Sequence, residues 1–200
     1  MERGGFLELT FEMEVPEGAV DKGALALCVY LRTILCALVV AAGISAQELA
    51  WWVTARFTPS QTAYENLRTA DINPNWDKML VLDDVRVPPH AKPDFPSMSR
   101  DGFAFQVDNF FKRPGISDRE ITGVYQDKSG HHGRFLLVLE RAGTGPWKVA
   151  FLLPVEGDAG FSVFYRNGET LSWSFCMYCD GGSRLTFRGG QYRLETGPAH

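Results

Sequence analysis

The sequence predicts a mainly β protein of the α+β kind, in which an antiparallel meander forms a sandwich or a partial barrel after one or two N-terminal helices. From Gly102 onward, apolar and polar residues alternate with a period of two, which is typical of half-buried strands. Glycine-containing turns such as Asn167-Gly168 and Gly189-Gly190 separate these runs. Helical spacing of apolar residues is confined to residues 49–70. Helices are therefore expected first and antiparallel strands afterwards.

An apolar run over residues 24–46 precedes the predicted domain and is divided by one charge, Arg32. The stretch after Arg32 has the length of a signal-peptide core, and it ends in Ile44-Ser45-Ala46, which fits a signal-peptidase site. We therefore expect a signal peptide that is cleaved between Ala46 and Gln47, and a periplasmic or secreted location. The alternatives are an inner-membrane signal anchor with Arg32 at the interface, and a buried helix of a soluble protein.

The acidic leader, residues 1–23, does not have the positive charge expected ahead of a signal-peptide core. It carries two basic and six acidic residues. One hypothesis is that this leader is not translated and that synthesis begins at Val29, which leaves the terminal amine and Arg32 before the core. The competing interpretation is a strand, because apolar residues alternate with Glu and Thr from Leu7 to Val15. Mass spectrometry of the native protein distinguishes an N-terminus near Gln47 from one within the leader.

Cleavage after Ala46 would leave a single exported β-rich domain of 154 residues, 47–200, which is a usual domain size. This domain carries 17 basic and 18 acidic residues, so its net charge is near −1. That balance gives no electrostatic case for binding nucleic acid or an anionic membrane. We expect membrane contact only through an uncleaved 24–46 segment.

A helix is predicted over residues 59–70. Thr58-Pro59 places a capping hydroxyl before a proline at the first helical position. Ala63, Leu67 and Ala70 then recur at helical spacing. A shorter helix is expected just before it, with its apolar face formed by Leu49, Trp52 and Val53.

The next predicted elements are a strand over residues 81–87 and a proline-rich loop at residues 88–96. Four prolines in this loop impose an extended, irregular chain. We interpret it as a loop within one domain, because the preceding chain is too short to bury a core of its own.

Alternating strands make up the rest of the predicted domain. They cover residues 103–107, 121–126, 135–140 and 147–153. Asp118-Arg119-Glu120, between the first two, is expected to be a solvated turn.

Two hairpins can be predicted by register. Asn167-Gly168 as a type I′ turn would place Arg166 opposite Glu169 and Phe164 opposite Leu171. Gly189-Gly190 would place Phe187 opposite Tyr192 and Leu185 opposite Leu194, with Thr186 and Arg193 on the solvated face.

Cys176-Met177-Tyr178-Cys179 is the one motif of the predicted domain that suggests chemistry. In an exported protein two cysteines are most simply a disulfide. A straight strand would place them about 10 Å apart, whereas a disulfide needs α-carbons within about 7 Å. The chain must therefore turn at Met177-Tyr178. Such a small loop would shape a turn more than stabilise the domain.

Thiol-redox and metal-binding roles are the alternatives for these cysteines. Redox motifs of this spacing usually begin a helix, but here a strand precedes the motif and glycines follow it. A zinc site would need ligands in addition to Cys176 and Cys179. The candidates are His131 and His132, which lie in the loop Ser129–Gly133. We expect no metal or other cofactor.

A small envelope hydrolase is a further alternative, although no recognised catalytic motif supports it. The candidates are His131 or His132 as general base, Asp83, Asp84 or Asp127 as orienting carboxylate, and Ser129 as nucleophile. Neither a nucleophile elbow nor a phosphate-binding glycine loop accompanies them in the sequence.

The favoured interpretation is a non-catalytic binding or inhibitory module with an envelope or extracellular protein as its partner. A compact β domain with aromatic-rich strands presents recognition surfaces without catalytic residues. The turn after Cys176 would present Met177 and Tyr178 to the partner, where an exposed aromatic residue could anchor the contact.

Overall fold

The computed structural model describes residues 50–89, 95–179 and 182–196, all of which belong to one compact unit, Glu48–His200. The predictions for the leader, the apolar run and the cleavage site fall on residues 1–47 and lie outside the described residues. In the described part of the chain, none of the helices has the length and apolarity needed to cross a lipid bilayer.

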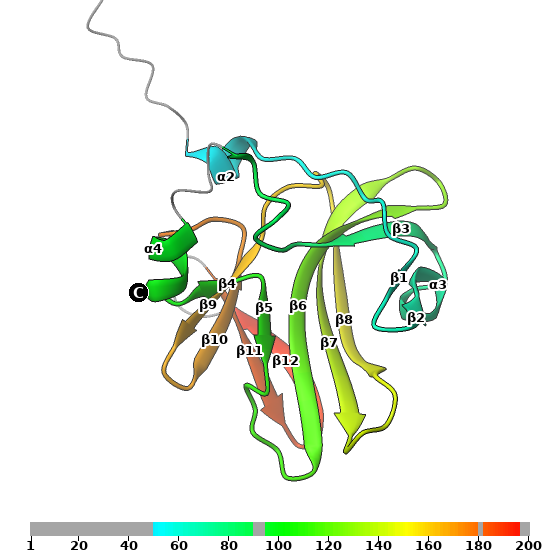
Figure 1. The fold of residues 1–200 in the computed structure, drawn as a ribbon, viewed down its shortest axis with the longest axis vertical. Helices are drawn as coiled ribbons and strands as arrows, with labels where there is room; N and C mark the ends of the chain where they lie inside the picture. The colour runs from blue at the N-terminus through cyan, green and yellow to red at the C-terminus, as the bar shows by residue number, and fades with distance from the viewer. Residues whose placement is uncertain (1–49, 90–94, 180–181, 197–200) are drawn as a thin grey trace, which may run out of the picture. The chain divides into compact units, whose positions relative to one another are not determined.

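The described residues form two five-stranded antiparallel sheets and one two-stranded hairpin (Figure 1). The first sheet, called the β6 sheet, has the order β3-β6-β7-β8, and β5 also pairs with β6. Its strands are β3 (Trp76–Val81), β5 (Gln106–Asp108), β6 (Ile116–Asp127), β7 (His132–Ala142) and β8 (Lys148–Glu156).

The second sheet, called the β10 sheet, has the order β12-β11-β10-β9-β4. Its strands are β4 (Phe103–Ala104), β9 (Val163–Asn167), β10 (Thr170–Ser174), β11 (Ser183–Arg188) and β12 (Gln191–Thr196). The two sheets pack together without closing into a barrel. The prediction of a mainly β sandwich is therefore confirmed.

Strand β7 of the β6 sheet is buried on both of its faces. Five consecutive apolar residues, Phe135 to Leu139, are fully buried. A run that is apolar on both faces of a strand indicates that both faces are covered. Leu136 and Val138 face the β10 sheet, whereas Phe135, Leu137 and Leu139 pack on the other side against a cluster that includes Trp76 and Tyr125.

A buried polar contact joins the two sheets. The Trp173 indole of β10 donates a 2.9 Å hydrogen bond to the Thr122 hydroxyl of β6, which also lies 2.5 Å from the Ser162 hydroxyl. All three side chains are buried. Each of these three buried polar groups therefore has a hydrogen-bond partner inside the sandwich.

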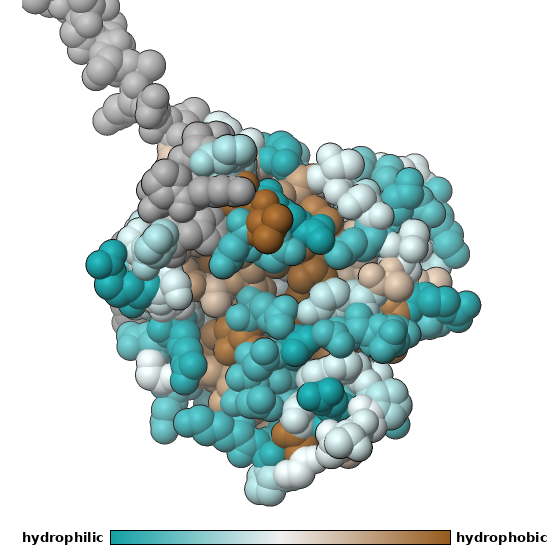
Figure 2. All heavy atoms as spheres, viewed as in Figure 1, coloured by the Kyte–Doolittle hydropathy of each residue, from teal (hydrophilic) through white to brown (hydrophobic). Residues whose placement is uncertain are grey.

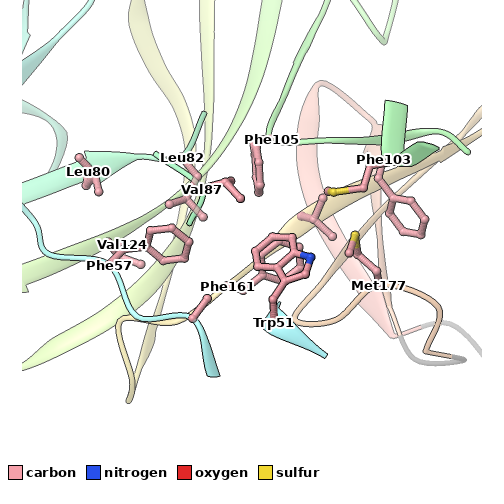
Figure 3. Close-up of a cluster of buried hydrophobic side chains, with 13 residues drawn as sticks. Trp51, Phe57, Leu80, Leu82, Val87, Phe103, Phe105, Val124, Phe161 and Met177 are labelled. Carbon is pink, nitrogen blue, oxygen red and sulfur yellow. The ribbon is translucent and has the colours of Figure 1, made fainter. Parts of the chain in front are cut away.

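A third cluster brings together apolar side chains from residues 51–57, from the β6 sheet and from the β10 sheet (Figure 3). Trp51 packs edge-on against Phe161 with ring centroids 5.1 Å apart. Trp51 belongs to the short helix α2 (Trp51–Thr54), which lies where the sequence predicts the shorter helix. Met177, from the turn between the cysteines, is part of the same cluster.

The prediction of a helix over residues 59–70 is wrong. This segment forms the hairpin β1 (Ala63–Tyr64) and β2 (Leu67–Arg68), followed by the one-turn helix α3 (Thr69–Ile72). Glu65 and Asn66 both have positive φ, and this two-residue turn breaks the helical path. Tyr64 and Leu67 pack against the β6 sheet, whereas Ala63 and Ala70, which share the helical spacing with Leu67, are exposed.

The predicted strand over residues 81–87 is also displaced. The strand ends at Val81, and Asp83 then forms a turn by accepting hydrogen bonds from the backbone N–H groups of Val85 and Arg86. In the following proline-rich region, the helix α4 (Phe95–Arg100) begins before the predicted loop ends.

The Gly189-Gly190 hairpin has the predicted register, with Phe187 opposite Tyr192 and Leu185 opposite Leu194. Thr186 does pair with Arg193, but its side chain is buried and not solvated. It donates a hydrogen bond to the Arg193 carbonyl.

The Asn167-Gly168 hairpin has a different register from the predicted one. Asn167 pairs with Thr170, and Phe164 pairs with Trp173 in place of Leu171. The turn residues are thus Gly168 and Glu169, and Gly168 supplies the positive φ. The shift is two residues, so every side chain keeps its face.

Candidate binding groove

A groove of about 310 Å³ opens where β10 and β11 separate. β11 pairs with β12 from Ser183 to Arg188, but its pairing with β10 covers only Ser183 to Leu185. Thr186, Phe187 and Arg188 therefore border the groove on one side, and the loop between β5 and β6 borders it on another. The lining comprises Phe110, Phe111, Lys112, Arg166, Gly168, Glu169, Arg184, Leu185, Thr186, Phe187 and Arg188.

The groove is basic although the chain as a whole has a net charge of −4. Its lining contains four cationic side chains and one acidic one, Glu169. Among the ion pairs of the described residues, none joins Lys112, Arg166 or Arg184 to a carboxylate. Aromatic rings lie beside these cations, and the Arg166 guanidinium is 5.7 Å from the centre of the Phe110 ring. An anionic group with an apolar neighbour would suit this lining.

Arg113 holds the β5–β6 loop against the β10 sheet. Its Nη2 donates to the Glu140 carboxylate at 2.5 Å and to the Tyr192 hydroxyl at 2.8 Å. Its guanidinium also lies 4.3 Å from the centre of the Phe187 ring. One arginine thus links β7, β11 and β12. Lys112, next to it, has a φ of 48°, which is uncommon for a long side chain.

Two buried carboxyl groups, those of Asp118 and Glu120, lie near Arg113. The prediction of a solvated turn at Asp118-Arg119-Glu120 is therefore wrong. These residues belong to β6, and the side chains of Asp118 and Glu120 are fully buried. Both lie on the face of β6 that is turned toward the β10 sheet, as Thr122 does. At residues 118–120, β6 pairs with β7 on one side and with β5 on the other. This segment is therefore a strand and not a turn.

Glu120 is the more isolated member of this pair. Its partners across the sheet are Val107 and Val138, and its carboxyl group has no hydrogen-bond partner in the described structure other than the neighbouring Asp118 carboxyl. Burial raises the pKa of Glu120 to about 9, and the neighbouring Asp118 carboxyl adds to the shift. Glu120 therefore carries a proton at neutral pH.

Asp118 and Tyr192 complete the network around Arg113. The Asp118 carboxyl accepts a hydrogen bond from the Phe111 backbone and lies 3.9 Å from the Arg113 Nη2. Burial raises the pKa of the Tyr192 hydroxyl, and the Glu140 carboxylate raises it further. This network fixes the wall of the groove.

The predicted disulfide joins Cys176 to Cys179, with α-carbons 5.9 Å apart. The chain turns between them as expected, with Tyr178 at a φ of 60°. The two residues of the turn behave differently from the prediction. Met177 is only 2% exposed and belongs to the core cluster, so it is not presented to a partner. Its apolar side chain anchors the turn instead.

Tyr178 is 63% exposed, as the predicted contact role requires. Its hydroxyl donates to Asp101 at 3.0 Å, and its ring packs edge-on against Phe103 and Trp52. The side chain is therefore held in one orientation at the surface.

The candidate hydrolytic residues are only partly brought together. The His131 Nδ1 lies 3.2 Å from the Asp127 carboxylate in the exposed β6–β7 turn, and the same carboxylate accepts hydrogen bonds from the Ser129 and His131 backbone N–H groups. Asp83 is instead paired with Arg86. His132 borders a separate shallow hollow with residues 57–59 and 157–159.

The alternative metal site is not assembled in the described structure. Cys176 and Cys179 are bonded to each other. Within the described residues, no three His, Cys, Asp or Glu side chains are grouped so that they could hold a metal ion. His131 and His132 therefore do not join the two cysteines in a ligand set.

Sequence reasoning missed the groove, although part of its signal was present. Phe110-Phe111-Lys112-Arg113 places two aromatic residues next to two cations in one short segment. Arg184 and Arg188 are four residues apart in β11 and therefore lie on one face of it. The sequence does not show that β10 separates from β11. This separation opens the groove that both segments line.

Comparison with protein-family models, with curated protein sequences and with solved structures finds no match to this chain.

Proposed function

We propose that this chain is a non-catalytic binding or inhibitory module, exported to the periplasm or the cell exterior, and that it recognises an acidic partner protein in the basic groove. The observation that carries the proposal is the groove itself, in which Lys112, Arg166 and Arg184 have no ion-pair partner among the described carboxylates. Arginine and aromatic side chains are enriched at protein interfaces, and arginine can bind a carboxylate through two parallel hydrogen bonds.

Charge and preorganisation support this site over other parts of the surface. The face in Figure 2 is mostly hydrophilic, with small and separate hydrophobic areas. The groove, in contrast, combines cations with apolar residues such as Phe111 and Leu185. Arg113 fixes the loop that forms one wall, so binding costs little ordering of that loop.

Tyr178 supplies a second contact surface in this proposal. It is exposed, and its hydroxyl and ring contacts hold it in place. A rigid aromatic side chain of this kind contributes contact area at a low cost in conformational entropy.

The test uses a fluorescent hexapeptide of alternating Glu and Val, with fluorescence anisotropy as the readout. Double charge reversal, Arg166→Glu with Arg184→Glu, should weaken binding at least about tenfold, because two attractive contacts become repulsive. Lys128→Glu makes the same kind of change in an exposed residue at the opposite end of β6 and should leave binding unchanged. Equal binding by the double variant and the native chain would rule out the groove.

A small hydrolase that uses His131 is the second candidate, favoured by the contact of its ring with Asp127. It predicts that His131→Ala abolishes hydrolysis of a generic ester substrate by the purified protein. The binding module predicts that this variant retains peptide binding.

A further inference from the structure

We propose that the groove takes its partner by strand addition, in which an extended segment of the partner pairs with the free edge of β11 at Thr186–Arg188. This inference rests on the proposed binding function and specifies its mode. The partner segment would carry acidic residues at alternate positions, with apolar residues between them.

The unpaired half of β11 is the basis of the proposal. Leu171 of β10 pairs with Leu185, so continued pairing would bring Thr170 opposite Thr186. Thr170 pairs with Asn167 of β9 but not with β11, so β10 and β11 separate after the Leu171–Leu185 pair. In the described structure Thr186–Arg188 pair with β12 alone.

An antiparallel strand turns the N–H and C=O of successive residues to opposite sides. Within Thr186–Arg188, either Phe187 or its two neighbours therefore direct both backbone groups toward the groove. These groups are the donors and acceptors that an added strand uses. Three residues of edge are about 10 Å long, which matches a segment of three to five residues.

The side chains along this edge specify the sequence of the added strand. Phe187 lies on the face of the sheet that packs inward, opposite Tyr192 and beneath the Arg113 guanidinium. Arg184 and Arg188 lie on the other face and are exposed. An added strand places alternate side chains next to these two environments. Apolar residues would adjoin Phe187, and acidic residues would adjoin the arginines.

The same charges disfavour a second copy of β11 as the occupant. Two copies of this edge would bring Arg184 and Arg188 of each chain close to those of the other, which is a repulsive arrangement. Arg188 is partly neutralised by Glu195 at 3.6 Å, whereas Arg184 has no such contact with a described carboxylate. An acidic strand from a different protein relieves the repulsion.

The experiment compares capped hexapeptides of alternating Glu and Val that differ only in backbone N-methylation. One peptide is methylated on alternate residues and a second on the remaining residues, so that only one of them loses the N–H groups that face β11. The amides of Thr186–Arg188 are followed by nuclear magnetic resonance and hydrogen exchange. A Lys-for-Glu peptide controls for charge, and Arg184→Gln with Arg188→Gln is compared with Lys128→Gln.

Strand addition predicts that one methylated peptide binds at least about tenfold more weakly than the other, because it loses the N–H groups that donate to the edge of β11. It also predicts slower exchange of at least one amide within Thr186–Arg188 when the unmethylated peptide is bound. Equal binding of both methylated peptides, or unchanged exchange, would overturn strand addition while leaving an acidic-partner groove in place. Binding of no acidic peptide by the native chain would refute the proposed function as well. Dimerisation of the native chain with slower exchange of the Thr186–Arg188 amides would instead assign the edge to a second copy of the chain.

Discussion

Replacing Glu120 by Gln should change how the stability of this protein depends on pH. The Glu120 carboxyl is buried between Val107 and Val138, and its pKa is raised from 4.5 to about 9. The folded protein therefore retains a proton that the unfolded chain releases once the pH exceeds 4.5. The stabilising contribution is complete at lower pH and is lost as the pH rises through the folded-state pKa.

The size of the effect follows from the pKa shift. Each pH unit between the two pKa values lowers the free energy of unfolding of the native chain by about 1.4 kcal/mol. At pH 7 the accumulated loss from this one carboxyl is about 3 kcal/mol, since pH 7 lies about 2.5 units above the unfolded-state pKa. Gln has nearly the same shape and does not titrate, so the variant avoids this loss.

Urea denaturation at several pH values between 5 and 8 measures this difference. The stability of Glu120→Gln relative to the native chain should rise by about 4 kcal/mol across that range. Glu156→Gln, the same replacement at an exposed position of β8, should run parallel to the native chain. A constant difference between Glu120→Gln and the native chain, at every pH, would refute the assignment of a protonated buried carboxyl.

Three further predictions concern contacts that hold the sandwich and the groove. Thr122→Val removes the acceptor of the Trp173 indole and should lower the free energy of unfolding by about 1–3 kcal/mol in urea denaturation; exposed Thr144→Val is the control, and equal stabilities would contradict the inter-sheet contact. Arg113→Met leaves Glu140 and Asp118 without their cation and should cost about 2–4 kcal/mol. It should also speed amide exchange in residues 109–115, and unchanged exchange would show that Arg113 does not hold the loop. Cys176→Ser with Cys179→Ser opens a very small loop and should cost no more than about 2 kcal/mol. Thiol titration of the native protein should find these two cysteines protected, and loss of cooperative unfolding in the double variant would refute a merely local role.

Local chemistry made several elements predictable. The two glycines at 189–190 both have positive φ and impose the register that pairs Phe187 with Tyr192. The spacing of Cys176 and Cys179 required a turn between them, and the structure has it. The sequence predicts strands in the right parts of the chain after Gly102, although it predicts the start of β6 as a turn. Each of these outcomes depends on residues that are close together in the sequence.

Other elements failed because tertiary contacts outweighed local preference. Ala63, Leu67 and Ala70 have helical spacing, but a hairpin lets Tyr64 and Leu67 pack on the β6 sheet. The turn moves by one residue, from Asn167-Gly168 to Gly168-Glu169, and the resulting register pairs Phe164 with Trp173 in the core. Packing of large side chains decides between the two local conformations.

The sequence by itself determined a β-rich chain, the closing hairpin and the disulfide turn. Only the tertiary structure decided that Asp118 and Glu120 are buried and that Lys112, Arg166 and Arg184 line one groove. The physical reason is that burial and charge clustering depend on what packs against a residue. β6 pairs with β5 and β7 and is covered by the β10 sheet, so carboxyl groups with the local sequence of a solvated turn lie inside the sandwich.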